Sequence, residues 1–161
     1  MVDNWRGALV EHVEDPAVFD DDSAAAAVSA FAERSGGLEA AVIDAASVFG
    51  AGGTEGMAAS LDASWTFARA AATAGMIERG GGTIVFVAPE SAVGDLPAIA
   101  VADGLENAAR ALSVEWARFD IRVVAICPRA GALRSDIADL VVWLCSASGT
   151  YAAGCRISPG S

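Results

Sequence analysis

Short β-branched or aliphatic runs alternate with long alanine-rich segments along this chain, and this alternation constrains the fold more than any other feature. Five runs have strand character, namely GALVEHV, LEAAVID, TIVFV, IRVVAIC and GCRIS. Alternation of this kind is typical of an α/β fold in which helices cover both faces of a parallel sheet. The chain has 161 residues and shows no internal repeat or linker, so we expect a single domain over residues 1–161.

Apolar residues recur at helical spacing between these runs. The first helix is expected in DDDSAAAAVSAFAERSGG, with Ser23 as its N-cap and Gly36 and Gly37 as its stop. Two longer helices are expected at about 58–79 and 98–118, with stripes formed by Leu61, Trp65, Ala68, Ala72 and Met76 and by Val101, Leu105, Ala108, Leu112 and Trp116. Ser135 is expected to cap the last helix, whose inner face consists of Ile137, Leu140, Val141 and Leu144.

Charge and cysteine content exclude several classes of partner. The chain carries 21 acidic and ten basic residues, a net charge of −11, and every basic residue is an arginine. Such a surface repels nucleic-acid phosphates and anionic lipids, so we expect neither nucleic acid nor a membrane as partner. No apolar run approaches the roughly 20 residues that span a bilayer, and the acidic start lacks the features of a signal peptide. Cys127, Cys145 and Cys155 are odd in number and lack metal-ligand spacing, which predicts a reduced, cytoplasmic protein without a metal site.

Three stretches of the chain resemble the short-chain dehydrogenase/reductase (SDR) family. GMIERGGGTIVFV resembles the family's helix end and central strand, and GLENAARALSVEWARFDIRVVAICP resembles its active-site helix and the strand after it. IADLVVWLCSASGTYAAGCRISPG resembles its C-terminal helix and last strand. With GGLEAAVIDAA before them, the resemblance covers roughly residues 17–161 and implies a Rossmann-like, doubly wound parallel sheet.

The catalytic pair of the family is missing. The family uses a Tyr-x-x-x-Lys pair, in which the tyrosine exchanges a proton with the substrate oxygen and the lysine lowers the tyrosine pKa and holds the nicotinamide ribose. Anchoring on GLENAARAL places these roles at Ala98 and Ala102. A methyl group can neither donate a proton nor carry a charge. No shift of the alignment restores the pair, because the chain has no lysine and its only tyrosine is Tyr151.

Other signatures of the family are also changed. Ala88-Pro89 follow the TIVFV strand, where the resemblance implies a serine that polarises the substrate carbonyl. Ile43 to Ala46 replace the Asn-Asn-Ala-Gly motif, and Pro128-Arg129 replace a Pro-Gly that lies against the cofactor. Glu11 to Asp15 stand where the family has its glycine-rich cofactor loop. The resemblance therefore implies that this chain binds no dinucleotide.

The start of the chain indicates a trimmed sheet. RGALV resembles the family's first strand, but the chain then passes almost directly to the helix before the family's fourth strand. One helix and two strands would be deleted, which leaves about five strands in the order 1-4-5-6-7 with the first strand at an edge. The alternative is that ALVEHV is the family's third strand and that the first is lost.

Three side chains could support new chemistry in the emptied crevice. His12 and Asp44 follow predicted strands at the carboxyl edge of the sheet, where open α/β sheets bind ligands, and Cys127 ends another strand there. Neighbouring Asp44 and His12 could act as a general acid/base pair. The alternative interpretation is a helix-capping aspartate, a loop histidine and a buried thiol. The loop GAGGTEG lacks the third glycine of a Rossmann fingerprint and the lysine of a phosphate loop, which favours a plain loop.

Retained packing positions with lost chemical positions indicate a subunit kept for assembly. The two long helices correspond to those that pair between subunits in the family, so the candidate interface residues are Leu61, Trp65, Leu105, Leu112 and Trp116. We expect a catalytically silent SDR pseudoenzyme that assembles with an intact SDR paralogue, or with itself, and stabilises or shapes the partner's site. NAD(P) would be bound by the partner and not by this chain.

Two alternatives stay open. The trimmed scaffold could bind a small molecule or catalyse a cofactor-free dehydration, cyclisation or isomerisation, with Asp44, His12 and Cys127 as candidates. The chain could also be a decaying gene product that folds and does little. Because loss of part of the sheet exposes an apolar face, we expect poor behaviour of the isolated monomer.

Overall fold

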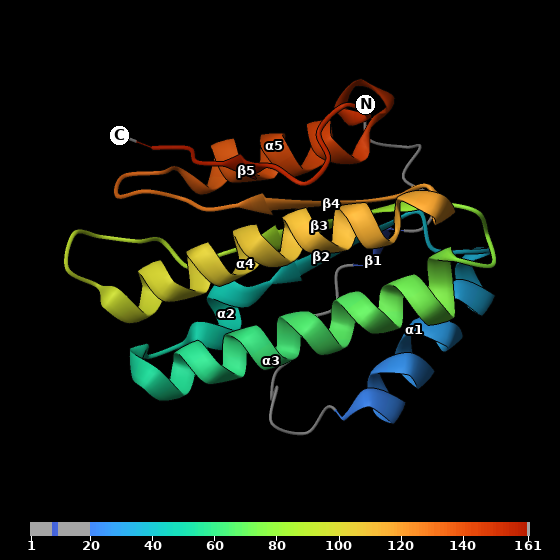
Figure 1. Cartoon of the computed structure of the whole chain (residues 1–161), viewed down its shortest axis with the longest axis horizontal. Coiled ribbons are helices and arrows are strands. Elements are labelled where there is room, and N and C mark those ends of the chain that lie inside the picture. Colours follow the sequence, from blue (N-terminus) through green and yellow to red (C-terminus); the bar gives the residue numbers. More distant parts are fainter. Residues whose placement is uncertain (1–7, 10–19, 161) are drawn as a thin grey trace.

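A computed structural model of the chain describes residues 8–9 and 20–160, and within them five parallel strands form one sheet. The strands are β1 (Ala8–Leu9), β2 (Ala40–Asp44), β3 (Gly82–Val87), β4 (Ile121–Ile126) and β5 (Arg156–Ile157). They lie side by side in sequence order and all run in the same direction (Figure 1). The chain therefore has to cross back from the end of each strand to the start of the next. Parallel strands require such crossovers, and the long alanine-rich segments supply them.

Helices cover both faces of the sheet, but unequally. One face carries α1 (Asp21–Ser35), α3 (Gly53–Ala71) and α4 (Leu96–Glu115), and the other carries α5 (Arg134–Cys145). A π-helical turn, Ala72–Met76, continues α3, and the short helices Ala117–Phe119 and Ala147–Gly149 follow α4 and α5. In Figure 1, α3 and α4 run side by side in front of the sheet, with α1 beside α3.

The observed strand order confirms the predicted fold class. The order β1-β2-β3-β4-β5 corresponds to 1-4-5-6-7 in the family's numbering, and β1 lies at an edge as expected. Ala8 and Leu9 pair with Ala40 and Ala41 of β2. β1 therefore occupies the place beside the fourth strand that the family's first strand holds, which favours the first-strand interpretation over the third-strand one.

The larger apolar core lies between the sheet and the three-helix face. The predicted stripe of α4 is buried there, because Val101, Leu105, Leu112 and Trp116 all face the sheet. Leu144 of α5 is buried on the opposite face against Val85, Val124 and Ile126, with Ile137, Leu140 and Val141 partly buried around it. The periodicity of both helices thus predicted their inner faces correctly.

Helix ends differ from the sequence prediction in several places. Asp20, and not Ser23, is the N-cap of α1, since its carboxylate accepts a hydrogen bond from the Ser23 N–H at 2.9 Å. The predicted stop is confirmed at Gly36, whose φ of 76° is the left-handed conformation that glycine adopts most readily. Leu133, and not Ser135, precedes α5, and no side chain caps that helix.

The glycine-rich loop is shorter than expected. A five-residue helix that the sequence analysis missed, α2 (Ala45–Phe49), follows β2 directly, and α3 already begins at Gly53. A side chain at Gly56 would collide with the backbone of Phe49, so this glycine allows α2 and α3 to approach each other. No helix within residues 20–160 is long and apolar enough to cross a bilayer.

Candidate functional site at the carboxyl edge of the sheet

The positions that correspond to the family's tyrosine and lysine lie inside the core. Ala98 and Ala102 of α4 are both completely buried. The Ala98 N–H donates to the Asp95 carboxylate that caps α4, at 3.2 Å, and the Ala102 carbonyl accepts from the Cys127 thiol at 3.6 Å. Neither position opens onto solvent, so the two alanines neither supply catalytic groups nor line a crevice.

A cavity of about 430 Å³ lies at the carboxyl edge, on the face of the sheet that α5 covers. Its apolar walls come from the ends of β2 and β3 and from the inner face of α5, and they include Val42, Val87, Pro128, Ile137 and Val141. Asp44, Ser47, Glu90 and Arg134 add polar groups. Concave, largely apolar sites with a few polar groups are typical of small-molecule pockets.

Asp44 acts as the N-cap of α2. Its carboxylate accepts hydrogen bonds from the N–H of Ser47 at 3.2 Å and from the hydroxyl of Ser47 at 2.7 Å. The helix-capping interpretation of Asp44 is therefore confirmed. The side chain is nevertheless exposed and lines the cavity, so its free lone pairs are accessible to a ligand.

Cys127 is a buried thiol on the other face of the sheet. It is completely buried in the three-helix core, and burial raises the pKa of its thiol to about 11. A thiol with such a pKa is protonated near neutral pH and is a poor nucleophile. The structure thus places Cys127 and Asp44 on opposite faces of the sheet, so these two candidate residues do not share a site. His12 lies outside the described residues.

The glycine-rich segment borders a second hollow, of about 530 Å³, between α2 and the start of α3. Its charged lining residues are Glu55 and Asp62, both acidic. Two carboxylates, with no cation among the described residues of the lining, oppose the binding of a phosphate group. This electrostatic argument supports the plain-loop interpretation over phosphate binding.

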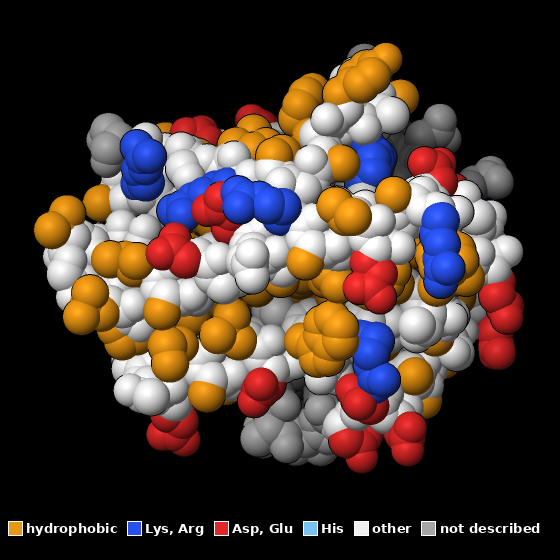
Figure 2. Space-filling view, in the orientation of Figure 1, with side chains coloured by type: hydrophobic (Ala, Val, Ile, Leu, Met, Phe, Trp, Pro, Cys, Tyr) orange, Lys and Arg blue, Asp and Glu red, His pale blue; other side chains and the backbone are white. Residues whose placement is uncertain are grey.

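The predicted interface residues divide into two groups. Leu105, Leu112 and Trp116 are buried in the chain's own core, so the structure corrects their assignment to an intermolecular surface. Leu61 is half-buried against Gly104 between α3 and α4, whereas Trp65 is 51% exposed. The exposed small or apolar side chains of α3 and α4 are Ala58, Trp65, Ala100, Ala111 and Val114, and exposed polar residues lie among them, namely Asp62, Asp103, Asn107 and Arg110. Figure 2 shows apolar side chains beside acidic and basic ones on this side of the molecule.

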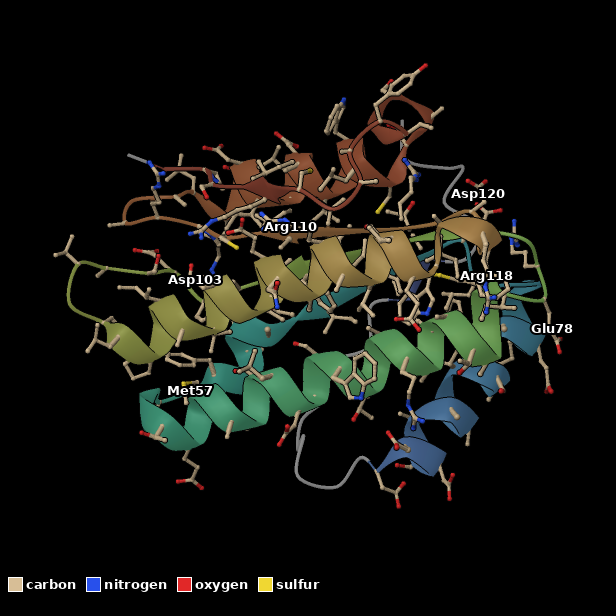
Figure 3. All side chains as sticks on the ribbon, viewed as in Figure 1. Met57, Glu78, Asp103, Arg110, Arg118 and Asp120 are labelled. Atoms are coloured by element: carbon tan, nitrogen blue, oxygen red, sulfur yellow. The ribbon has the colours of Figure 1, made fainter. Side chains whose placement is uncertain are left out.

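An ion cluster on α4 escaped the sequence analysis. Arg156 of β5 contacts Asp103 at 2.9 Å and Glu106 at 3.2 Å, and Glu106 also binds Arg110 at 2.7 Å. Figure 3 shows Asp103 and Arg110 on the same helix. The i,i+4 spacing of Glu106 and Arg110 is visible in the sequence, but nothing there predicts Arg156 as their partner. The cluster attaches the edge strand β5 to α4.

Comparison with solved structures connects this geometry with known proteins. A short-chain dehydrogenase from Mycobacterium smegmatis matches with a TM-score of 0.74 and 21% identity, over 88% of this chain and 66% of that one. A protein described as a putative short-chain alcohol dehydrogenase from Sinorhizobium meliloti matches with a TM-score of 0.69 and 28% identity, over 86% of this chain and 70% of that one. This chain has the short-chain dehydrogenase fold. Acetoin dehydrogenase from Salmonella typhimurium shares the short-chain dehydrogenase fold with a TM-score of 0.70 and 19% identity, over 90% of this chain and 71% of that one.

The short-chain dehydrogenase fold is present here in a trimmed form, because the chain spans only about 70% of the length of these solved proteins. No protein-family model matches the sequence, and no curated protein matches it significantly. The agreement therefore lies in the arrangement of strands and helices. Packing of apolar residues can preserve such an arrangement after most other side chains have changed.

Proposed function

We propose that this chain is a catalytically silent subunit that assembles with an intact NAD(P)-dependent dehydrogenase/reductase of the same fold and stabilises or shapes its active site. The observation that carries the proposal is the complete burial of Ala98 and Ala102. The helix of the family's catalytic pair is retained, but both catalytic positions have become part of the core. Buried methyl groups at these two positions can neither donate nor accept a proton, so the retained helices support a role in assembly rather than in catalysis.

The residues present do not fit a nicotinamide dinucleotide. The buried methyl group of Ala102 cannot hold the ribose, and the exposed side chain of Arg129 stands where the family has a glycine against the cofactor. Asp44 and Glu90 outnumber Arg134 among the charged lining residues of the cavity at the carboxyl edge, and this balance opposes a pyrophosphate. These features support a role in which the partner, and not this chain, binds NAD(P).

The outward face of α3 and α4 is the proposed contact surface. Trp65 projects from α3 and Val114, which is 77% exposed, projects from α4. Alanines beside them allow the helices of a partner to approach closely. A large exposed tryptophan amid small residues is typical of the energetically dominant residues of protein interfaces.

Trp65→Arg is expected to abolish co-purification of an intact SDR-fold partner when the tagged chain is isolated from its own host. Truncation of a dominant interface residue costs about 2 kcal/mol or more, which corresponds to roughly a thirtyfold loss of affinity. The measurement is native mass with mass-spectrometric identification of the partner. Tyr151→Arg is the matched control and is expected to leave assembly unchanged, because Tyr151 is a 98% exposed aromatic residue that follows the short helix Ala147–Gly149 and is not part of the proposed contact surface.

Two outcomes would contradict the assembly role. One is a clean monomer or homodimer of the unmodified chain. The other is a captured partner whose activity and stability are the same with and without this chain. Circular dichroism of the Trp65→Arg protein must match that of the unmodified protein, so that a loss of binding is not caused by unfolding.

The cavity at the carboxyl edge favours a second candidate, a scaffold that binds a small molecule or catalyses a cofactor-free reaction with Asp44. Asp44→Asn is expected to abolish such a reaction, because an amide cannot accept a proton, while the cap of α2 is largely kept. Turnover by the isolated chain without nucleotide is the measurement, with Asp62→Asn as a control at an exposed acid on α3. Equal turnover by both variants would exclude Asp44 as a general base.

A further inference from the structure

A hollow at the opposite edge of the sheet has a chemistry that the proposed function does not use. It has a volume of about 340 Å³ and lies at the amino ends of β3 and β4, where Figure 3 shows Asp120. Met57, at the start of α3, lies at the other end of the molecule in the same view. The lining residues are Glu39, Arg79, Gly80, Gly81, Gly82, Thr83, Asp120, Arg122, Cys145 and Thr150.

Arg122 is the central cation of this hollow. It is the second residue of β4 and lies half-buried on the face of the sheet that α5 covers. Its Nη2 donates to the Thr83 hydroxyl at 2.6 Å, whereas its Nη1 is buried and has no acceptor among the described residues. No carboxylate within residues 20–160 lies within ion-pair distance of Arg122. Its positive charge is thus left unpaired in that part of the chain.

The neighbouring groups do not neutralise this charge. Glu39 is already engaged in an ion pair with Arg79. Burial raises the pKa of the Cys145 thiol to about 11, so this thiol stays protonated and uncharged beside Arg122. Thr83 is buried, and its hydroxyl accepts from Arg122 but donates to no described residue. Two hydrogen-bond donors, the Arg122 guanidinium and the Thr83 hydroxyl, therefore lack an acceptor at the same place.

We propose that this hollow binds the carboxylate group of a small organic anion through Arg122 and Thr83. A carboxylate offers two oxygens in one plane, which match a guanidinium N–H and an adjacent hydroxyl. Asp120 on the lining disfavours a doubly charged phosphate group more than a singly charged carboxylate, whereas the charge of Glu39 is compensated by Arg79. The site is separated from the cavity at the carboxyl edge by the length of the strands, so it does not depend on the proposed function.

The test is an NMR titration of the full chain, labelled with ¹⁵N, using sodium acetate, inorganic phosphate and sodium chloride at equal ionic strength. Acetate is expected to cause saturable shifts of the Thr83 and Arg122 amides that chloride does not cause. Arg122→Gln and Thr83→Val are each expected to weaken acetate binding by about tenfold or more, because hydrogen bonds to a charged group are lost. Thr83→Ser, which keeps the hydroxyl that Thr83→Val removes, is expected to bind acetate as the unmodified chain does.

Arg129→Gln is the matched control for charge. It removes one exposed arginine at the carboxyl edge and is expected to leave acetate binding unchanged. Absence of saturable shifts with acetate would overturn the site. Tighter binding of phosphate than of acetate would overturn the assignment to a carboxylate. Equal weakening by Arg129→Gln and Arg122→Gln would show that net charge, and not this hollow, attracts the anion.

Discussion

Ala102→Lys, which restores the family's lysine, is expected to destabilise the folded chain by about 3–5 kcal/mol and to produce no dehydrogenase activity. Ala102 is completely buried in the three-helix core, so the new ammonium group would lose its hydration among apolar side chains. The extra methylene groups would also overpack the contact between α4 and the sheet, at a further cost of about 1–3 kcal/mol. A loss of stability of this size is enough to unfold a marginally stable domain.

Urea unfolding of the purified chain measures this effect. Ala100→Lys is the matched control, because Ala100 lies on the same helix two residues earlier and is exposed. This control is expected to change the free energy of unfolding by less than about 0.5 kcal/mol. If Ala102→Lys were as stable as Ala100→Lys, position 102 would be accessible to solvent, and the argument for a sealed catalytic site would be wrong.

Leu105→Ala is expected to lower the free energy of unfolding by about 2–5 kcal/mol, even at concentrations where the chain is monomeric. Leu105 is 1% exposed and is packed between α4 and the sheet, so truncation leaves a cavity inside one chain. Val114 on the outward face of the same helix is the control, and Val114→Ala is expected to cost less than about 0.5 kcal/mol in the monomer.

Unfolding curves at several protein concentrations distinguish a core residue from an interface residue. A core residue lowers stability at every concentration, whereas an interface residue acts only where subunits associate. If Leu105→Ala lowered the free energy of unfolding only at concentrations where subunits associate, Leu105 would be an interface residue. By contrast, Val114→Ala and Trp65→Arg change residues of the proposed contact surface, so they are expected to affect assembly more than the stability of the single chain.

Much of the fold could be predicted from the sequence, because each strand and helix has a local pattern. The stripes of α4 and α5 follow a 3.6-residue period, and one face of such a helix must be buried. Helix ends were predicted less well, since Asp20 and Ser23 are both good capping residues and only the backbone path decides between them. The short helix α2 was missed because five residues carry too little periodicity.

The candidate site could be predicted only in part. Residues that are missing can be identified from composition, and the absence of lysine excludes the Tyr-Lys pair in any register. Residues that meet in space cannot be identified in this way. Asp44 and Cys127 both end strands, but they belong to opposite faces of the sheet, and a shift of one residue along a strand changes the face.

The sequence by itself determined the α/β architecture and the absence of the Tyr-Lys pair, because periodicity and residue type are local properties, whereas the strand order was implied by the resemblance to the SDR family. Only the tertiary structure decided that Ala98 and Ala102 are sealed in the core, that Leu105, Leu112 and Trp116 face inward, and that Arg122 has no counter-ion among the described residues. Burial and charge pairing depend on which elements pack against a side chain. Those neighbours come from distant parts of the chain and are fixed only when the sheet and its helices assemble.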